Sequence, residues 1–291
     1  MRALDEAMKE KSTMPHVPMV FGAEITLPAI GFGTGGLTGA AGVEAITGAL
    51  ETGYRLLDSA VNYENEGAVG AAVRRSSVPR EEIVVTSKLP GRHHAYDQAL
   101  ATVEESVLRT GLDHLDLYLI HWPNPRVDRY VEAWQALITA RDRGLVRAIG
   151  VSNFLPEHLD RLIDETGVTP AVNQVELHPS WPQSALRAAN GDRGIVTQAW
   201  CPIGRGGPLL DHLLLRSIGE RYGVSPAQVA LRWSIQLGVV PIPRSANPER
   251  QYENLDVFDF ALTDEEMDQL SALGPGDGWV RGLDPAEHEE F

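Results

Sequence analysis

The sequence predicts an α/β fold of the (β/α)8 barrel (TIM barrel) class, with an N-terminal β-hairpin and extra C-terminal helices. The chain has 291 residues, of which 43% are hydrophobic, so it can bury one large core. Short apolar runs alternate eight times with segments of helical spacing. No linker rich in Pro, Gly or Ser divides the chain. Eight strands that alternate with helices without interruption favour a closed parallel barrel.

The N-terminal segment is predicted to lie outside the barrel. Residues 1–17 are polar and have no sustained hydrophobic period, so we expect a flexible extension without catalytic residues. A β-hairpin is expected next, over residues 19–26, with its turn at Gly22. Residues 18–291 are expected to form a single barrel domain.

The barrel strands are predicted from short segments rich in β-branched residues or leucine. They are residues 29–32, 55–58, 83–88, 115–121, 146–151, 171–176, 195–200 and 239–243.

The segments between these strands have the spacing of amphipathic helices. One example is the set Leu100, Val103, Val107 and Leu108, which we expect on one buried face. Two later helices are predicted to begin with capping boxes, in which the first and fourth side chains satisfy each other's backbone donors. These boxes are residues 225–228 (SPAQ) and 263–266 (TDEE).

Composition and charge exclude several partners. The formal net charge of -15 disfavours a nucleic-acid partner, because binding to phosphate backbones needs a basic surface. The one cysteine, Cys201, cannot form an internal disulfide, and the sequence has no apolar run that would serve as a signal peptide or span a bilayer. We therefore expect a cytoplasmic monomer without a membrane partner. Any anionic cofactor must be bound by a local cluster of positive charge.

Four ionisable residues are predicted to meet at one end of the barrel. Reactive groups of such barrels lie where the strands end, at the C-terminal face. The second, third and fourth predicted strands end in Asp58, Lys88 and His121, and the loop after the second strand carries Tyr63. These four side chains are therefore the candidate catalytic residues.

Their chemistry suits proton transfer to a carbonyl oxygen. The pKa of a tyrosine is ordinarily about 10, and a nearby ammonium such as that of Lys88 lowers it. Asp58 keeps that lysine protonated, and His121 can donate a hydrogen bond that polarises the carbonyl. Taken singly, each residue has a structural explanation: an ordinary Asp58–Lys88 ion pair, a loop tyrosine and a histidine at a strand end. Together, on consecutive strand ends, they favour a catalytic site.

On these residues the chain resembles the aldo-keto reductase superfamily, closest in pattern to its bacterial diketogluconate-reductase-like members. The order and spacing of Asp58, Tyr63, Lys88 and His121 are similar to the catalytic tetrad of that family. Further matching segments are residues 53–60 (GYRLLDSA), 86–88 (TSK), 120–123 (IHWP), 150–154 (GVSNF), 173–179 (NQVELHP), 242–245 (IPRS) and 248–250 (PER). The resemblance extends from about residue 18 to residue 270. It implies reversible, NADPH-dependent reduction of aldehydes or ketones to alcohols, with the proton from Tyr63 and a small carbonyl compound as the partner.

The resemblance also implies where NADPH or NADP+ binds. Ser152, Asn153 and Gln174 match the positions that hold the nicotinamide carboxamide, and Trp200 matches the aromatic residue that stacks on the nicotinamide ring. Arg244, Ser245 and Arg250 match the site for the ribose 2′-phosphate, which favours NADPH over NADH. The arginine at 244 replaces the lysine that is usual there, and a guanidinium can bind phosphate through two hydrogen bonds. The remaining matching cofactor positions are Gly33, Thr34, Cys201, Pro202, Ile203, Arg205, Glu253 and Asn254.

The expected substrate pocket departs from the family. Residues 35–37 read Gly-Gly-Leu where relatives often have a large aromatic, so the pocket is predicted to be wide. Trp122 is the predicted pocket wall. Trp279 is either a second wall or an aromatic packed on the barrel exterior. The acidic tail, residues 274–291, does not match the specificity loops of eukaryotic relatives, and the sequence assigns it no role.

Competing interpretations remain less well supported. Residues 31–36 fit the G-x-G-x-x-G motif of a dinucleotide-binding Rossmann fold, but no good helix begins at Leu37. His93 and His94 lack the spaced carboxylate or thiol that would complete a metal site, so no metal is expected. Residues 150–154 lack the final glycine of a serine-hydrolase elbow. A nucleotide-binding regulatory barrel with little turnover stays open as the alternative function, because a fold does not fix an activity.

Overall fold

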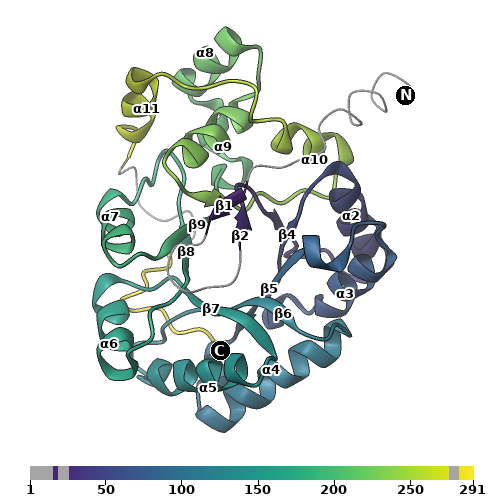
Figure 1. Cartoon of the computed structure of the whole chain (residues 1–291). Coiled ribbons are helices and arrows are strands. Elements are labelled where there is room, and N and C mark those ends of the chain that lie inside the picture. Colours follow the sequence, from purple (N-terminus) through teal and green to yellow (C-terminus); the bar gives the residue numbers. More distant parts are fainter. Residues whose placement is uncertain (1–15, 19–25, 275–281) are drawn as a thin grey trace.

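The computed structural model of this chain describes residues 16–18, 26–274 and 282–291, and within these residues it has a barrel of parallel strands with helices around it (Figure 1). The eight barrel strands follow one another in chain order, each hydrogen-bonded to the next. They are β3 (Phe32–Gly33), β4 (Leu56–Asp58), β5 (Val84–Leu89), β6 (Leu115–Ile120), β7 (Val146–Ser152), β8 (Val172–Glu176), β9 (Val196–Trp200) and β10 (Val240–Pro241). The predicted fold class is therefore confirmed.

The barrel closes between its first and last strands. The backbone N–H of Gly31 donates to Pro241 O, and that of Gly33 donates to Pro243 O, each at 2.9 Å. These two strands, β3 and β10, are shorter than predicted. They span residues 32–33 instead of 29–32 and residues 240–241 instead of 239–243. The two prolines lack an N–H and cannot donate to the ladder, which explains why regular pairing ends early at this seam.

The helices lie outside the strands and cover them (Figure 1). One helix follows each strand as α2 (Gly39–Thr52), α3 (Glu66–Arg75), α4 (Tyr96–Thr110), α5 (Tyr130–Asp142), α6 (Pro156–Thr166), α7 (Ser184–Asp192), α9 (Pro226–Gln236) and α10 (Pro248–Leu255). The extra helices are α8 (Leu213–Tyr222) and α11 (Asp264–Ser271), and short 3-10 turns are η1 (Val61–Tyr63), η2 (Arg80–Glu82), η3 (Gly91–His93), η4 (Gly204–Gly206) and η5 (Pro208–Asp211). None of the described helices is both long and apolar enough to cross a membrane.

The local helix predictions are confirmed with one exception. Both capping boxes are present, at the starts of α9 and α11. In α4, Val103 is fully buried, and Leu100 and Val107 pack partly buried against the core. The prediction for Leu108 is wrong, because this side chain is 72% exposed. At 3.6 residues per turn, residue 108 lies about 140° around the helix from residue 103 and so leaves the buried face.

The N-terminal end of the barrel is closed by an antiparallel pair, β1 (His16–Pro18) with β2 (Thr26–Pro28). The predicted extension is two residues too long, because His16 and Val17 belong to β1; residues 1–15 lie outside the described part. The predicted hairpin over 19–26 likewise falls outside it, except for Thr26. Leu27 is fully buried in one cluster with Leu56, Val84 and Leu117, which stand near the starts of their strands. This end is therefore filled by apolar side chains.

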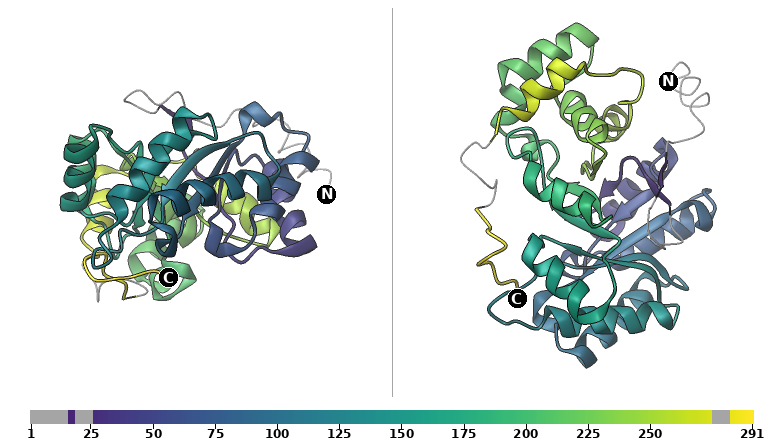
Figure 2. Two further views of the ribbon diagram at one scale, coloured as in Figure 1. Left: turned by 90° about the horizontal axis from the view of Figure 1, so that it is seen from below. Right: turned by 60° about the vertical axis from the view of Figure 1, so that its left-hand side comes forward.

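The β1–β2 pair and the C-terminal segment lie at opposite ends of the barrel. In the left view of Figure 2, the purple strands β1 and β2 and the yellow C-terminal segment are on opposite sides of the strands. The C-terminal segment, residues 282–291, contacts the loops that follow β4, β5 and β6. It thus lies at the end of the barrel where parallel strands of this fold carry their reactive groups.

Candidate active site

The four candidate catalytic side chains meet at the C-terminal end of three neighbouring strands. Asp58 is the last residue of β4, Lys88 lies one residue before the end of β5, and His121 directly follows β6. Tyr63 ends the turn η1, one loop after Asp58. Since β4, β5 and β6 pair in parallel, their ends face the same side. The structure therefore brings these four residues together at one end of the barrel, as predicted.

Asp58 and Lys88 form a buried ion pair. The Lys88 Nζ lies 2.5 Å from Asp58 Oδ1 and donates to Ser59 O at 2.9 Å, and the two side chains are 0% and 6% exposed. Burial lowers the pKa of Lys88, but the charge of Asp58 and the proximity of Tyr63 outweigh burial and raise it above its ordinary value. Lys88 therefore stays protonated at neutral pH, as expected.

Tyr63 lies beside this ammonium but keeps its proton. The Lys88 Nζ is 5.0 Å from the centroid of the Tyr63 ring. Burial raises the pKa of Tyr63, the Lys88 charge lowers it, and Asp58 raises it again, so the pKa is above its ordinary value. The sequence-based expectation of a lowered pKa is therefore wrong in the net direction, because burial exceeds the effect of the lysine. Tyr63 is a neutral phenol at neutral pH, which is the form that can donate a proton.

His121 also lies beside Tyr63. The two rings meet edge to face, with centroids 5.9 Å apart. The Nδ1 atom of His121 lies 2.8 Å from Glu290 Oε1, at hydrogen-bonding distance, although the ring N–H is not aligned on that oxygen. Glu290 belongs to the C-terminal tail, to which the sequence assigned no role.

The residues predicted to hold the nicotinamide are hydrogen-bonded to the same catalytic residues. Gln174 Nε2 donates to Asp58 Oδ2 at 2.7 Å. Asn153 Nδ2 donates to His121 O at 2.9 Å, and its Oδ1 accepts a hydrogen bond from Trp200 Nε1 at 2.8 Å. Ser152 Oγ donates to Gln174 O at 2.7 Å. One network therefore fixes the indole, the amides and the catalytic carboxylate relative to one another.

The predicted phosphate-binding residues gather at the start of α10. Ser245 is buried and exchanges hydrogen bonds with the backbone of Asn247, which caps α10 by accepting from Arg250 N. The exposed side chains of Arg244 and Arg250 pair with no carboxylate among the residues that the structure describes. In a chain of net charge -15, two such arginines next to a helix N-terminus make this region locally positive.

The end of β3 and the residue after it contact both the predicted phosphate-binding residues and the catalytic residues. A Cβ on Gly33 would lie 3.2 Å from Arg244 Cβ, so only glycine allows this approach without a shift. Thr34 is fully buried and its hydroxyl donates to Asp58 O at 2.8 Å. The other predicted cofactor residues lie in two places. Cys201, Pro202, Ile203 and Arg205 are in the turns after β9, and Glu253 and the buried Asn254 are on α10.

Two residues predicted to shape the substrate pocket differ in their surroundings. A Cβ on Gly35 would stand 3.7 Å from the Tyr63 ring, so a large side chain there would cover the phenol. Trp122 is 5% exposed and packs edge-on against His288, with ring centroids 4.4 Å apart. Trp279 lies outside the described residues.

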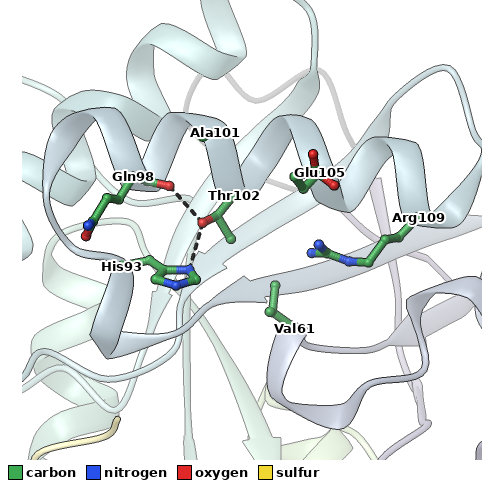
Figure 3. A pocket seen from close by; sticks show the side chains of 7 residues that line it. All are labelled: Val61, His93, Gln98, Ala101, Thr102, Glu105 and Arg109. Carbon is green, nitrogen blue, oxygen red and sulfur yellow. Dashed lines mark hydrogen bonds between the residues drawn. The ribbon is translucent and has the colours of Figure 1, made fainter.

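Behind the catalytic loop lies a separate pocket of about 270 Å³, between α4 and the turns η1 and η3 (Figure 3). Thr102 Oγ1 donates to Gln98 O at 2.7 Å and bonds His93 Nδ1 at 2.8 Å. None of the predicted catalytic or cofactor residues lines this pocket.

The adjacent histidines have different surroundings. His93 bonds Thr102, whereas His94 is buried, and neither of its ring nitrogens has a hydrogen-bond partner among the residues that the structure describes. Burial lowers the pKa of His94 to about 4. Across the described residues, no three His, Cys, Asp or Glu side chains are grouped closely enough to hold a metal ion.

Sequence reasoning missed the residues through which the tail reaches this site: Asn62, Gly91, Asn124, His288 and Glu290. The tail has neither a periodic pattern nor a motif, and Asn62 and Glu290 are 228 positions apart. Only the fold brings them together.

Comparison with known proteins places this geometry among reductases. Residues 29–275 match the model of the Aldo/keto reductase family. The chain is 53% identical over 281 residues to 2,5-diketo-D-gluconic acid reductase B of a Corynebacterium species, covering 96% of this chain and all of that protein. It is 48% identical over 267 residues to an aldo-keto reductase of a Mycobacterium species, covering 92% of this chain and 93% of that protein.

Solved structures agree with the sequence relatives. A mutant of Gox0644 in complex with NADPH has a TM-score of 0.89 at 39% identity, covering 96% of this chain and 100% of that one. The Bombyx mori aldo-keto reductase in complex with NADP has a TM-score of 0.83 at 35% identity, covering 90% and 93%.

Proposed function

This chain belongs to the aldo/keto reductase family, and on that premise we propose that it reduces small aldehydes and ketones to alcohols with NADPH, using Tyr63 as the proton donor. The observation that carries the proposal is the buried Asp58–Lys88 pair beside Tyr63, with the His121 ring in edge-to-face contact with the phenol. A buried charge pair is costly to maintain in a barrel core, which favours a catalytic reason for it.

In this mechanism each of the four side chains has one task. Tyr63 is a neutral phenol because burial raises its pKa, so it can give a proton to the carbonyl oxygen. The Lys88 ammonium stabilises the phenolate that remains, and Asp58 holds that ammonium in place. His121 donates a hydrogen bond to the same carbonyl oxygen and fixes its direction. Substrate activation and proton delivery thus act on one atom.

The residues present suit a phosphorylated nicotinamide cofactor. Trp200 offers a flat face fixed by its hydrogen bond to Asn153, and Ser152, Asn153 and Gln174 offer the donors and acceptors that an amide requires. Arg244 and Arg250, which have no carboxylate partner in the described chain, suit a 2′-phosphate. When bound, the cofactor supplies hydride to the carbonyl carbon. Two solved relatives are complexes with NADPH or NADP, which supports the same choice here.

The substrate class is inferred from the pocket and from one relative. Gly35 has no side chain that would contact the Tyr63 ring, which suits a substrate larger than a simple aldehyde. The Corynebacterium relative is named as a reductase of diketogluconic acid, a polar dicarbonyl sugar acid. We therefore propose small dicarbonyls and keto-sugars as the best substrates. The cytoplasmic location, the monomeric state and the single-domain organisation stay predictions from the sequence.

The experiment is a turnover assay on the purified chain. Oxidation of NADPH is followed with a panel of aldehydes, ketones, dicarbonyls and keto-sugars, and NADH is run in parallel. We expect turnover with NADPH, fastest for the dicarbonyls and keto-sugars. Tight NADPH binding without turnover on the whole panel would overturn the proposal and favour a nucleotide-sensing barrel.

A further inference from the structure

The last residues of the chain form an ordered cap on the loops of the candidate active site. Asp284 closes a turn in which its carbonyl accepts hydrogen bonds from the N–H groups of Glu287 and His288, at 3.0 and 2.7 Å. From that turn onward, His288 packs on Trp122, and Glu289 Oε1 accepts from the backbone N–H of Arg126 at 2.6 Å. The segment is thus held at several points next to the catalytic histidine.

Glu290 is fixed by its backbone as well. Asn124 Nδ2 donates to Glu290 O at 2.7 Å, and the Glu290 N–H donates to Asn124 Oδ1 at 3.1 Å. Asn124 is fully buried and has a positive φ of 47°. A Cβ on Gly91 would stand 2.4 Å from Glu290 O and 2.3 Å from Asn124 Nδ2. The close approach of the tail therefore requires glycine at residue 91.

The Glu290 carboxylate bridges the loops after β4, β5 and β6. Its Oε1 accepts from Asn62 Nδ2 at 2.8 Å and lies 2.8 Å from His121 Nδ1, and its Oε2 accepts from Gly91 N at 3.1 Å. The side chain is 13% exposed. Burial raises the pKa of Glu290, but its contacts with His121, Gly91 N–H and Asn62 outweigh burial and lower it below its ordinary value. The carboxyl is therefore an anion at neutral pH.

An anion at this position restricts the state of the His121 ring. The two ring nitrogens are distinct, and the partner of one decides what the other can do. A carboxylate oxygen facing Nδ1 requires a proton there, because a bare Nδ1 would turn its lone pair toward the oxygen. Nε2 is then the nitrogen left for substrate, and a ring protonated on both atoms donates from it. Such hydrogen bonds often become aligned only when substrate is bound.

We propose that Glu290, in the C-terminal tail, is a positioning residue for His121: its carboxylate faces Nδ1–H of a ring that carries a proton on both nitrogens, and so directs Nε2–H to donate to the carbonyl oxygen of the substrate. The inference rests on the proposed reductase function, for which His121 supplies the hydrogen bond to the substrate. It gives the tail a role in the reaction that the barrel alone does not provide.

The test compares two isosteric variants of the tail in the full chain. Glu290→Gln removes the anion at His121, whereas Glu287→Gln makes the same charge change on an exposed side chain four residues from the chain end. We expect Glu290→Gln to lower kcat by about 10- to 100-fold, as small misplacements of reacting groups do, with the NADPH Kd unchanged. Glu287→Gln should match the wild type in both quantities.

A double-variant cycle separates positioning from simple packing. In a His121→Ala background, Glu290→Gln should cause no further loss of kcat, since the residue acts through the ring that is absent. A loss that adds fully to that of His121→Ala would mean that the tail acts by packing alone and would overturn the proposal.

The state of the ring can be read without turnover. Long-range proton–nitrogen NMR of the His121 imidazole, assigned by comparison with the His121→Ala spectrum, reports which nitrogen carries a proton. We expect a proton on both ring nitrogens in the wild type and a changed ring state in Glu290→Gln. An unchanged ring, together with wild-type kcat in Glu290→Gln, would overturn this inference while leaving the reductase function intact. Failure of the wild type on every carbonyl, with the ring still responding to Glu290→Gln, would instead overturn the reductase function.

Discussion

The two ends of this barrel are built on opposite physical principles. At the N-terminal end, Leu27 packs with apolar side chains at the strand starts, and their burial stabilises the closure. At the C-terminal end, the buried ammonium of Lys88 pairs with the buried carboxylate of Asp58 and lies next to the phenol of Tyr63. Such groups cost stability unless each charge has its partner. The comparison indicates that packing holds the barrel together at one end, so that the other can carry chemistry.

The strongest way to break the catalytic end is to remove its ammonium. Lys88→Met should lower kcat by roughly 10²- to 10⁴-fold, because Tyr63 loses the charge that stabilises its phenolate. It should also destabilise the protein, since Asp58 is left buried and unpaired. The double variant Asp58→Asn with Lys88→Met should regain stability in urea unfolding without regaining turnover. Recovery of both quantities together would contradict the assigned role.

The raised pKa of Tyr63 predicts different pH profiles for the two reaction directions. In the fold its pKa lies above the ordinary value of about 10, so the phenol stays protonated throughout the neutral range. Reduction needs that proton, and its kcat should be flat between about pH 6 and pH 9. Alcohol oxidation needs the phenolate, and its rate should rise by about tenfold per pH unit until the pKa is reached. An oxidation rate that is flat in this range would argue against Tyr63 as the proton carrier.

Arg244 and Arg250, which pair with no carboxylate in the described part of the chain, allow a test of the comparison on the cofactor side. Replacing Arg244 and Arg250 by alanine should raise the NADPH Kd by at least about tenfold, since charge-assisted hydrogen bonds to a phosphate are lost. The NADH Kd should change little, because NADH has no 2′-phosphate. The Kd of each cofactor is measured by titration into the wild type and into the double variant. An equal loss of affinity for NADPH and NADH would contradict the assignment of these arginines to the 2′-phosphate.

The apolar end should affect stability and leave turnover alone. Leu27→Ala should lower the free energy of unfolding by about 2–5 kcal/mol, because it opens a cavity in a fully buried cluster. At temperatures where the variant stays folded, kcat should equal that of the wild type. A fall in kcat that matched the fall in stability would mean that the two ends are not independent.

At the catalytic end, the sequence predicts one part of the arrangement and not the other. The strand ends could be predicted because a buried parallel strand is a short apolar run, and Asp58, Lys88 and His121 each stand where such a run ends. The net pKa shift of Tyr63 could not, because it depends on the depth of burial against the distance to Lys88. Glu290 could not either, since its partners come from three loops that lie more than 160 positions earlier in the chain.

The central claim is that Tyr63 delivers the proton while the rest of the site holds cofactor and substrate, and Tyr63→Phe tests it most directly. This variant removes one oxygen atom and keeps the aromatic ring beside Lys88 and His121. Measured against the wild type with the best substrate of the panel, it should lose at least about 10²-fold in kcat, with an NADPH Kd that is nearly unchanged. A kcat close to that of the wild type would contradict the mechanism.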